Sequence, residues 1–245
     1  MPRGSRTVVI GWLVALLAIA AFVTLGQWQL GRMHQKQAML DAVASVLQQR
    51  DARALSAAAD PASRDGYTWS AGRGHFAEAP AVLLDNQMRD GRPGVRVYRV
   101  FVADAGGPPL LVELGWLPLE GRRMPVVERP AGEHSVTGLL LPPPVGGLLK
   151  AAPQVQPDGN LLVTSLLPAE LAPLLGQPAL APRVLRLDPD APLGHARDLD
   201  VLPNTLPPEK HLGYAVQWFA LALAVLATAV VLTYRLLRST RATRR

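Results

Sequence analysis

Residues 210–235 read KHLGYAVQWFALALAVLATAVVLTYR, and this stretch decides the architecture of the chain. Its uncharged run Ala215–Tyr234 has twenty residues, which at ~1.5 Å per helical residue match the ~30 Å of a hydrocarbon core. We therefore predict a membrane-spanning helix over residues 211–234. Its first turns, however, carry four side chains with polar atoms: His211, Tyr214, Gln217 and Trp218. Leucine would cross a bilayer at lower cost, so these side chains need an explanation.

A second apolar run, Val8–Leu25, has eighteen uncharged residues and predicts another span over residues 8–27. The alternative is a cleaved signal peptide, whose apolar region is usually ~7–15 residues long and is followed by a small-x-small cleavage site. This run is longer, and the following FVTLGQWQLGR offers no such site. We therefore expect an uncleaved anchor.

The basic residues predict the topology. The net charge of +6 is concentrated outside the two spans, with five arginines in residues 235–245 and two more, Arg3 and Arg6, before the first span. Arginine close to a span stays in the cytoplasm. We therefore expect residues 1–7 and the basic tail 235–245 to be cytoplasmic and residues 28–210 to lie in the periplasm of a bacterium. Charge placed this way indicates a protein of the inner (plasma) membrane and argues against nucleic-acid binding.

The region between the spans predicts an α+β fold that is mostly β. Helical spacing of apolar residues indicates a helix over about 35–59, which continues the first span and ends before Pro61. Short apolar runs between Gly- and Pro-rich turns then indicate a β-rich barrel or sandwich over about 66–188, followed by a loop over 189–210. The expected strands are 81–85, 95–103, 109–116, 134–141, 160–167 and 183–187. A short helix is expected at 168–176.

Motifs for chemistry are absent from the sequence. The chain has no cysteine, which excludes disulfides, thiolate metal sites and covalently attached haem. Its five histidines are scattered, and no P-loop, nucleophile elbow, zinc-protease or dinucleotide-binding motif occurs. A carboxylate pair drawn from Asp85, Asp90 and Glu113 would need the fold to bring it together. We therefore expect a protein that is not an enzyme.

The polar residues of the second span share one face. At ~100° per residue, His211, Tyr214 and Trp218 fall within about 60° of arc, with Gln217 at the edge. After the first span, Trp28 and Arg32 are spaced i and i+4, with Gln27 and Gln29 alongside, so paired spans would bring both groups to one depth. Physical chemistry leaves three interpretations open: interfacial anchoring, helix–helix recognition, and contact with a haem through a neutral imidazole. Small residues (Gly11 with Ala15, and the ridge Ala220, Ala224 and Thr228) would permit close helix packing.

Several motifs resemble a known family. LGQWQLGR after the first span, LLVELGWLPL in mid-chain and HLGYAVQWFALA at the start of the last span are similar to the Surfeit-locus-1 family of cytochrome c oxidase assembly factors. The fragment DNQMRDGRPGVRVYRVF also resembles this family, and the order of span, outer β-rich domain and span agrees over the full chain. The last motif, H-x-x-Y-A-x-Q-W-F, is the most specific of these.

The resemblance implies a role in maturing the haem site of oxidase subunit I. Haem a would be the transient cofactor, and subunit I and haem a synthase would be the protein partners. His211 becomes the candidate iron ligand, and the other candidate haem contacts are Tyr214, Gln217, Trp218, Trp28 and Arg32. The charge of Arg32 would suit the haem propionates. The alternative is a membrane scaffold that stabilises an oxidase assembly intermediate through the Ala220, Ala224 and Thr228 ridge without binding haem.

The sequence departs from the family pattern in two places. Where the central motif of the family commonly reads valine-asparagine-arginine-glycine-tryptophan, Glu113 and Leu114 replace the middle pair. After WQLGR, where tryptophan and lysine are common, Met33, His34 and Gln35 precede Lys36. The role of Glu113 is therefore a question for the structure.

Overall fold

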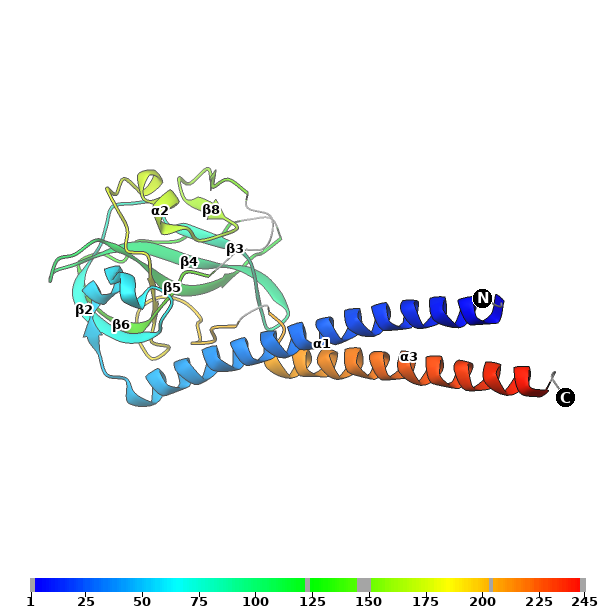
Figure 1. Ribbon diagram of the computed structural model, residues 1–245. Helices are drawn as coiled ribbons and strands as arrows, with labels where there is room; N and C mark the ends of the chain where they lie inside the picture. Colours follow the sequence, from blue (N-terminus) through cyan, green and yellow to red (C-terminus); the bar gives the residue numbers. More distant parts are fainter. Residues whose placement is uncertain (1–2, 122–123, 145–150, 203–204, 243–245) are drawn as a thin grey trace. The chain divides into compact units, whose positions relative to one another are not determined.

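The computed structural model describes residues 3–121, 124–144, 151–202 and 205–242 (Figure 1). The chain divides into two compact units, a helical unit of residues 1–40 and 205–245 and a strand-rich unit of residues 41–204. The predicted order of apolar helix, strand-rich domain and apolar helix is confirmed. The outer ends of the flanks predicted at 1–7 and 235–245, and residues 203–204 of the predicted loop, lie outside the described residues.

Two long helices carry the apolar runs of the sequence. α1 is Arg3–Gln49 and α3 is Pro208–Ala242. Both are long and apolar enough to cross a membrane. Pro208 suits the first turn of α3, where a helix has no partner for its backbone N–H groups, and Glu209 complements the positive end of the helix dipole there.

The helix expected at about 35–59 does continue the first apolar run as part of α1, but it ends ten residues early, at Gln49. Arg50 takes a positive φ of 47°, and its N–H still reaches the carbonyl of Val46. This left-handed turn ends the helix before the apolar spacing of the sequence does. Residues Leu55–Ala59 form only a short 3₁₀ helix, as do Pro61–Ser63.

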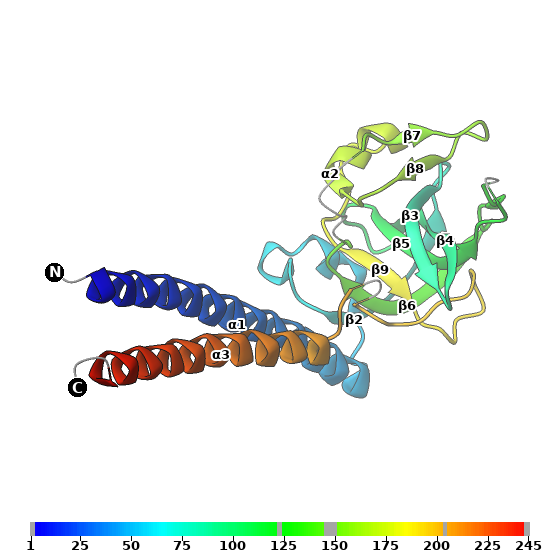
Figure 2. The same cartoon turned by 90° about the vertical axis from the view of Figure 1, so that its right-hand side faces the viewer.

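The strand-rich unit contains one sheet in the order β1-β2-β6-β9-β5-β4-β3-β8-β7. Its strands are β1 (Arg53–Ala54), β2 (Thr68–Phe76), β3 (Val82–Arg89), β4 (Arg92–Ala103), β5 (Leu110–Pro118), β6 (Glu133–Leu141), β7 (Gln154–Val155), β8 (Leu161–Val163) and β9 (Val184–Leu187). An additional pairing joins β2 to β4. The ladders β2–β6, β6–β9, β9–β5, β5–β4 and β4–β2 therefore close a ring of five strands, and Figure 2 shows β9 beside β5 and β6.

The ring closes at a glycine. Gly74 pairs with Ala103 of β4 and with His134 of β6. A Cβ at Gly74 would lie only 2.0 Å from the carbonyl oxygen of Val102. No other residue fits where the two ladders meet this closely.

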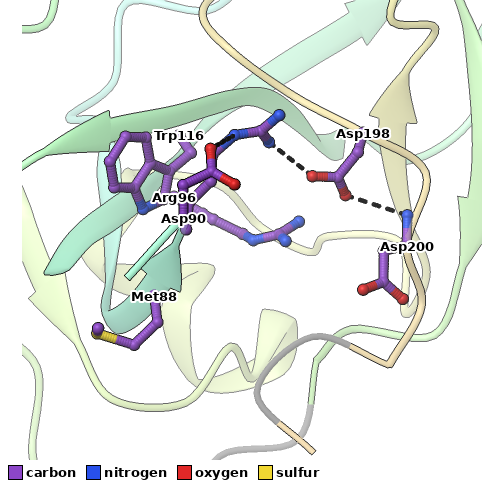
Figure 3. A pocket seen from close by; sticks show the side chains of 7 residues that line it. Met88, Asp90, Arg96, Trp116, Asp198 and Asp200 are labelled. Carbon is purple, nitrogen blue, oxygen red and sulfur yellow. Dashed lines mark hydrogen bonds and ion pairs between the residues drawn. The ribbon is translucent and has the colours of Figure 1, made fainter. Parts of the chain in front are cut away.

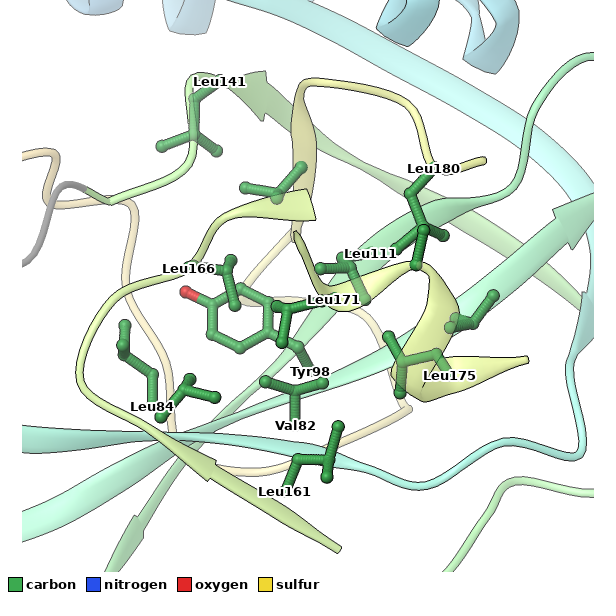
Figure 4. Packing of buried hydrophobic residues seen from close by; sticks show 14 of the residues in the cluster. Val82, Leu84, Tyr98, Leu111, Leu141, Leu161, Leu166, Leu171, Leu175 and Leu180 are labelled. Atoms are coloured by element: carbon green, nitrogen blue, oxygen red, sulfur yellow. The ribbon is translucent and has the colours of Figure 1, made fainter. Parts of the chain in front are cut away.

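Both faces of β4, β5 and β9 are buried over most of their length, which explains why their sequences do not alternate cleanly between apolar and polar. One face contributes to a core that includes Phe76, Phe101 and Leu185. The other face packs around Tyr98 beneath leucines of the short α2 helix (Pro168–Leu171) and the following 3₁₀ turn (Pro173–Leu175), as Figure 4 shows. The predicted helix at 168–176 thus exists as two short pieces.

The six expected strands are present with shifted ends, but β2 was not expected. Its sequence, TWSAGRGHF, is rich in small residues and lacks an apolar run. Partners distant in sequence hold it in place, β6 along its length and β4 at its end. Local sequence patterns contain no information on such pairings.

Candidate functional site

Within the helical unit, α1 and α3 run antiparallel and pack along a seam (Figure 1). The covered positions recur at alternating steps of four and three residues, the spacing of a coiled-coil seam. On α1 the positions with this spacing are Val8, Trp12, Ala15, Ile19, Phe22, Gly26, Gln29, Met33 and Lys36, and the neighbouring Ala18, Val23 and Leu30 are partly covered as well. On α3 they include His211, Ala215, Trp218 and Ala222.

Specific contacts fix the register of this seam. Trp12 Nε1 donates to Thr233 Oγ1 at 3.0 Å, and the rings of Phe22 and Trp218 stack with centroids 5.6 Å apart. Gly26 allows close approach, since a Cβ there would lie 2.6 Å from the ring of Phe219. The helices therefore meet at one defined register along the unit.

His211 lies in this seam and is the most buried of the predicted site residues, with 7% of its surface exposed. Its Nδ1 is 2.7 Å from Oε1 of Gln29 on α1. Its other ring nitrogen, Nε2, is covered by neighbouring atoms and has no hydrogen-bond partner among the described residues. A buried polar atom without a partner is costly and needs an explanation, of which a bound group is one.

Only Trp218 of the other predicted residues joins His211 in the seam. Tyr214 and Trp28 are 41% and 57% exposed, and Gln217 and Arg32 are exposed as well. Arg32 donates to Gln35 Oε1 at 2.8 Å on the surface of α1. The α1 residue that contacts the imidazole is thus Gln29, which the sequence placed only alongside Trp28.

One buried cation near the site was not singled out from the sequence. Lys36 is 7% exposed, and its ammonium donates to the carbonyl oxygen of Leu206 in the segment that leads into α3. A lysine at the seam position i+7 from Gln29 is the only sequence signal for this contact.

The predicted ridge Ala220, Ala224 and Thr228 does not take part in the seam. All three residues are exposed, and Thr228 bonds back to the carbonyl of Ala224. Of the predicted pair Gly11 and Ala15, Ala15 is buried in the seam. A Cβ added at Gly11 would have no other atom within 4 Å, so Gly11 takes no part in close packing.

The strand-rich unit has its own polar centre, built on Glu113. Arg96 Nη1 lies 2.6 Å from Oε1, and Arg186 Nε lies 2.9 Å from Oε2. Tyr98 donates its hydroxyl to Oε2 at 3.0 Å. Arg186 also donates to the carbonyl of Asp200, so the network ties the strands to the loop after β9.

The charges of this network are fixed by its geometry. Burial alone would raise the pKa of Glu113, but the guanidiniums of Arg186 and Arg96 and the hydrogen bonds hold that pKa below its ordinary value. Burial and the neighbouring carboxylate raise the pKa of Tyr98 well above its ordinary value. Glu113 is therefore ionised and Tyr98 neutral at physiological pH.

A cleft of about 210 Å³ opens beside Arg96 (Figure 3). It is lined by Met88, Arg89, Asp90, Arg96, Trp116, Asp198 and Asp200. Arg89 pairs with Asp198 at 2.6 Å, Arg96 pairs with Glu113, and Trp116 donates to the Gln87 carbonyl. These pairings brace the loop after β9 against the strands, while Nε of Arg96 has no hydrogen-bond partner among the described residues. No cluster of three or more candidate metal ligands occurs among the described residues.

The chain matches the model of a known protein family. The model of the SURF1 family matches residues 16–223, which include most of α1, the whole strand-rich unit and the beginning of α3 up to Leu223. No curated protein matches the sequence.

Proposed function

Because the chain belongs to the SURF1 family, a family of cytochrome oxidase assembly factors, we propose that it helps mature the haem site of oxidase subunit I. Subunit I is the proposed client, and haem a synthase is a further proposed partner. The protein would act without catalysis, by holding haem a or the haem-receiving subunit.

Its proposed location is the bacterial inner membrane, with α1 and α3 as the spans. Antiparallel pairing of the helices brings the start of α1 and the end of α3 to one side. Arg6 and Arg235 flank the apolar runs on that side, which favours the cytoplasm. The strand-rich unit would then lie in the periplasm.

The observation that carries the haem proposal is the buried, unpartnered Nε2 of His211. A neutral imidazole whose Nδ1 is held by a second group is the usual form of an iron ligand. Haem a would supply the iron that this nitrogen ligates. Tyr214, Gln217, Trp218, Trp28 and Arg32 are the proposed contacts around it, and Arg32 is the proposed partner of the propionates.

Because Nε2 of His211 is covered, haem could bind there only after a local rearrangement. Iron can reach this nitrogen only when the side chains over it move aside or the imidazole turns. Haem would therefore be taken up and released by opening the His211 end of the helix pair, as suits a transient carrier.

The test compares His211→Ala with His34→Ala, which removes an exposed histidine from α1. Full-length proteins are purified from cells that make haem a and from cells that lack its synthesis, and their absorption spectra are recorded. We expect the His211 variant to remain in the membrane with its haem a content lowered, and the His34 variant to resemble the wild type. Unchanged haem content in His211→Ala would remove His211 from this role.

A second candidate function is a scaffold that binds subunit I without haem. The exposure of Ala220, Ala224 and Thr228 on α3 favours it, because this ridge remains available for another helix. Under this alternative, Ala224→Leu would reduce recovery of subunit I with the protein more than His211→Ala does.

A further inference from the structure

We propose that Gln29 is a positioning residue, which fixes the tautomer of His211 so that Nε2 is the unprotonated nitrogen facing a ligand. The inference rests on the proposed haem contact at His211. It begins from the 2.7 Å contact between His211 Nδ1 and Gln29 Oε1 across the helix seam.

Hydrogen-bond chemistry determines the tautomer. An amide oxygen only accepts, so a ring nitrogen at 2.7 Å from it must carry the proton. A neutral imidazole has one such proton, and Nε2 is then left with its lone pair. In the opposite arrangement the Gln29 amide is turned over, so that its NH₂ group donates to Nδ1 of His211. The single ring proton would then lie on Nε2 of His211.

Burial disfavours that opposite arrangement. Nε2 is covered and has no hydrogen-bond partner among the described residues, so a proton there would be an unsatisfied buried donor. A ring protonated on both nitrogens would leave the same donor unpaired. The arrangement with Nδ1–H donating to Gln29 satisfies the only proton of the ring.

The seam places Gln29 where it can do this. Gln29 lies three residues after Gly26, where the close approach of Phe219 brings the two helices together. Gln27 has the same side chain but lies two residues earlier and is exposed, outside the seam. Gln27 therefore serves as a control residue: it has the same side chain as Gln29 at nearly the same position along α1 but lies outside the seam.

The first experiment reads the tautomer without haem. Full-length protein labelled with ¹⁵N-histidine is prepared in micelles from cells lacking haem a synthesis, and the His211 resonances are assigned with His211→Ala. At about pH 8, where a histidine of ordinary pKa is neutral, we expect the Nδ1–H form in the wild type. Gln29→Leu should abolish this preference, whereas Gln29→Glu, which keeps an acceptor, and Gln27→Leu should retain it.

An Nε2–H form in the wild type, or an unchanged tautomer in Gln29→Leu, would overturn the inference. Neither result depends on haem, so failure here is distinct from failure of the haem proposal, which His211→Ala tests.

The second experiment measures haem a bound by the same variants when its synthesis is restored. Partners of this kind typically change metal affinity by ~10–100-fold, so we expect Gln29→Leu to weaken binding about 10-fold and Gln29→Glu to restore it. Wild-type affinity in Gln29→Leu would show that the contact has no positioning role.

Discussion

Arg186 and Glu113 form an ion pair at 2.9 Å in which at most 2% of either side chain is exposed. Arg96 and Tyr98 complete the set of partners around the carboxylate. Glu113 is therefore the centre of a buried polar network. Its role is structural, because it joins β4, β5 and β9 to the loop after β9.

Removing the charge of Glu113 should destabilise the strand-rich unit strongly. Glu113→Gln leaves the buried guanidiniums of Arg96 and Arg186 without their carboxylate, which typically costs about 3–5 kcal/mol. The measurement is denaturant unfolding of full-length protein in micelles, followed by near-UV circular dichroism. Glu133→Gln is the control, because its pair with Arg73 is about 70% exposed on both sides. That change should cost less than about 1 kcal/mol. Equal losses of unfolding free energy in the two variants would show that the buried network does not depend on the charge of Glu113.

The same network predicts a pH dependence. The pKa of Glu113 is lower in the folded protein than in the unfolded chain. Its stabilisation is therefore complete above the unfolded value of about 4.3 and is lost as pH falls through the folded value. Unfolding midpoints should decrease as pH is lowered from about 5 to 3, and the decrease should be smaller in Glu113→Gln. A variant with the full wild-type decrease would assign the acid sensitivity to other carboxylates.

Closure of the strand ring should depend on Gly74. Gly74→Ala places a Cβ 2.0 Å from the Val102 carbonyl oxygen, so the β2–β4 ladder must separate. We expect a loss of about 3 kcal/mol in the free energy of unfolding, at the upper end of overpacking effects. Gly66→Ala is the control, because its Cβ would meet only the Ser63 carbonyl, at 3.4 Å. That substitution should change stability by less than about 0.5 kcal/mol. A stable Gly74→Ala protein would contradict the closed ring.

Membrane topology can be tested by labelling, because the natural chain has no cysteine. Val155→Cys lies on β7, where valine is 71% exposed, and Arg238→Cys lies on an exposed position of α3. A membrane-impermeant maleimide should label the first variant in intact spheroplasts and the second only after permeabilisation. The reverse pattern would invert the proposed orientation.

Long-range pairing limited what the sequence alone could predict. The two apolar helices were predictable because hydropathy over twenty residues needs no knowledge of neighbours. The end of α1 was not, since Arg50 turns the chain by a left-handed conformation that arginine rarely adopts. Strand β2 was missed because its position depends on β4 and β6.

The candidate site was likewise predictable where local sequence determines it and not where it depends on distant residues. Helical geometry identified His211 and its face, but it could not tell which side of that face would meet α1. Gln29 rather than Trp28 contacts the imidazole because the seam passes one residue further along. Glu113 was visible as an acidic residue in an apolar strand, whereas its partners are separated from it by 17 and 73 residues.

The position of β9 in the ring also determines when, during synthesis of the chain, the ring can close. β5 and β6 are translated well before β9, yet β9 lies between them. The apolar interior can therefore be sealed only after residue 187 has left the ribosome, shortly before α3 begins at Pro208. A nascent chain interrupted before Val184 would present unsealed apolar strands and become a substrate for chaperones and proteases. The strand-rich unit and the second apolar helix are thus completed almost together.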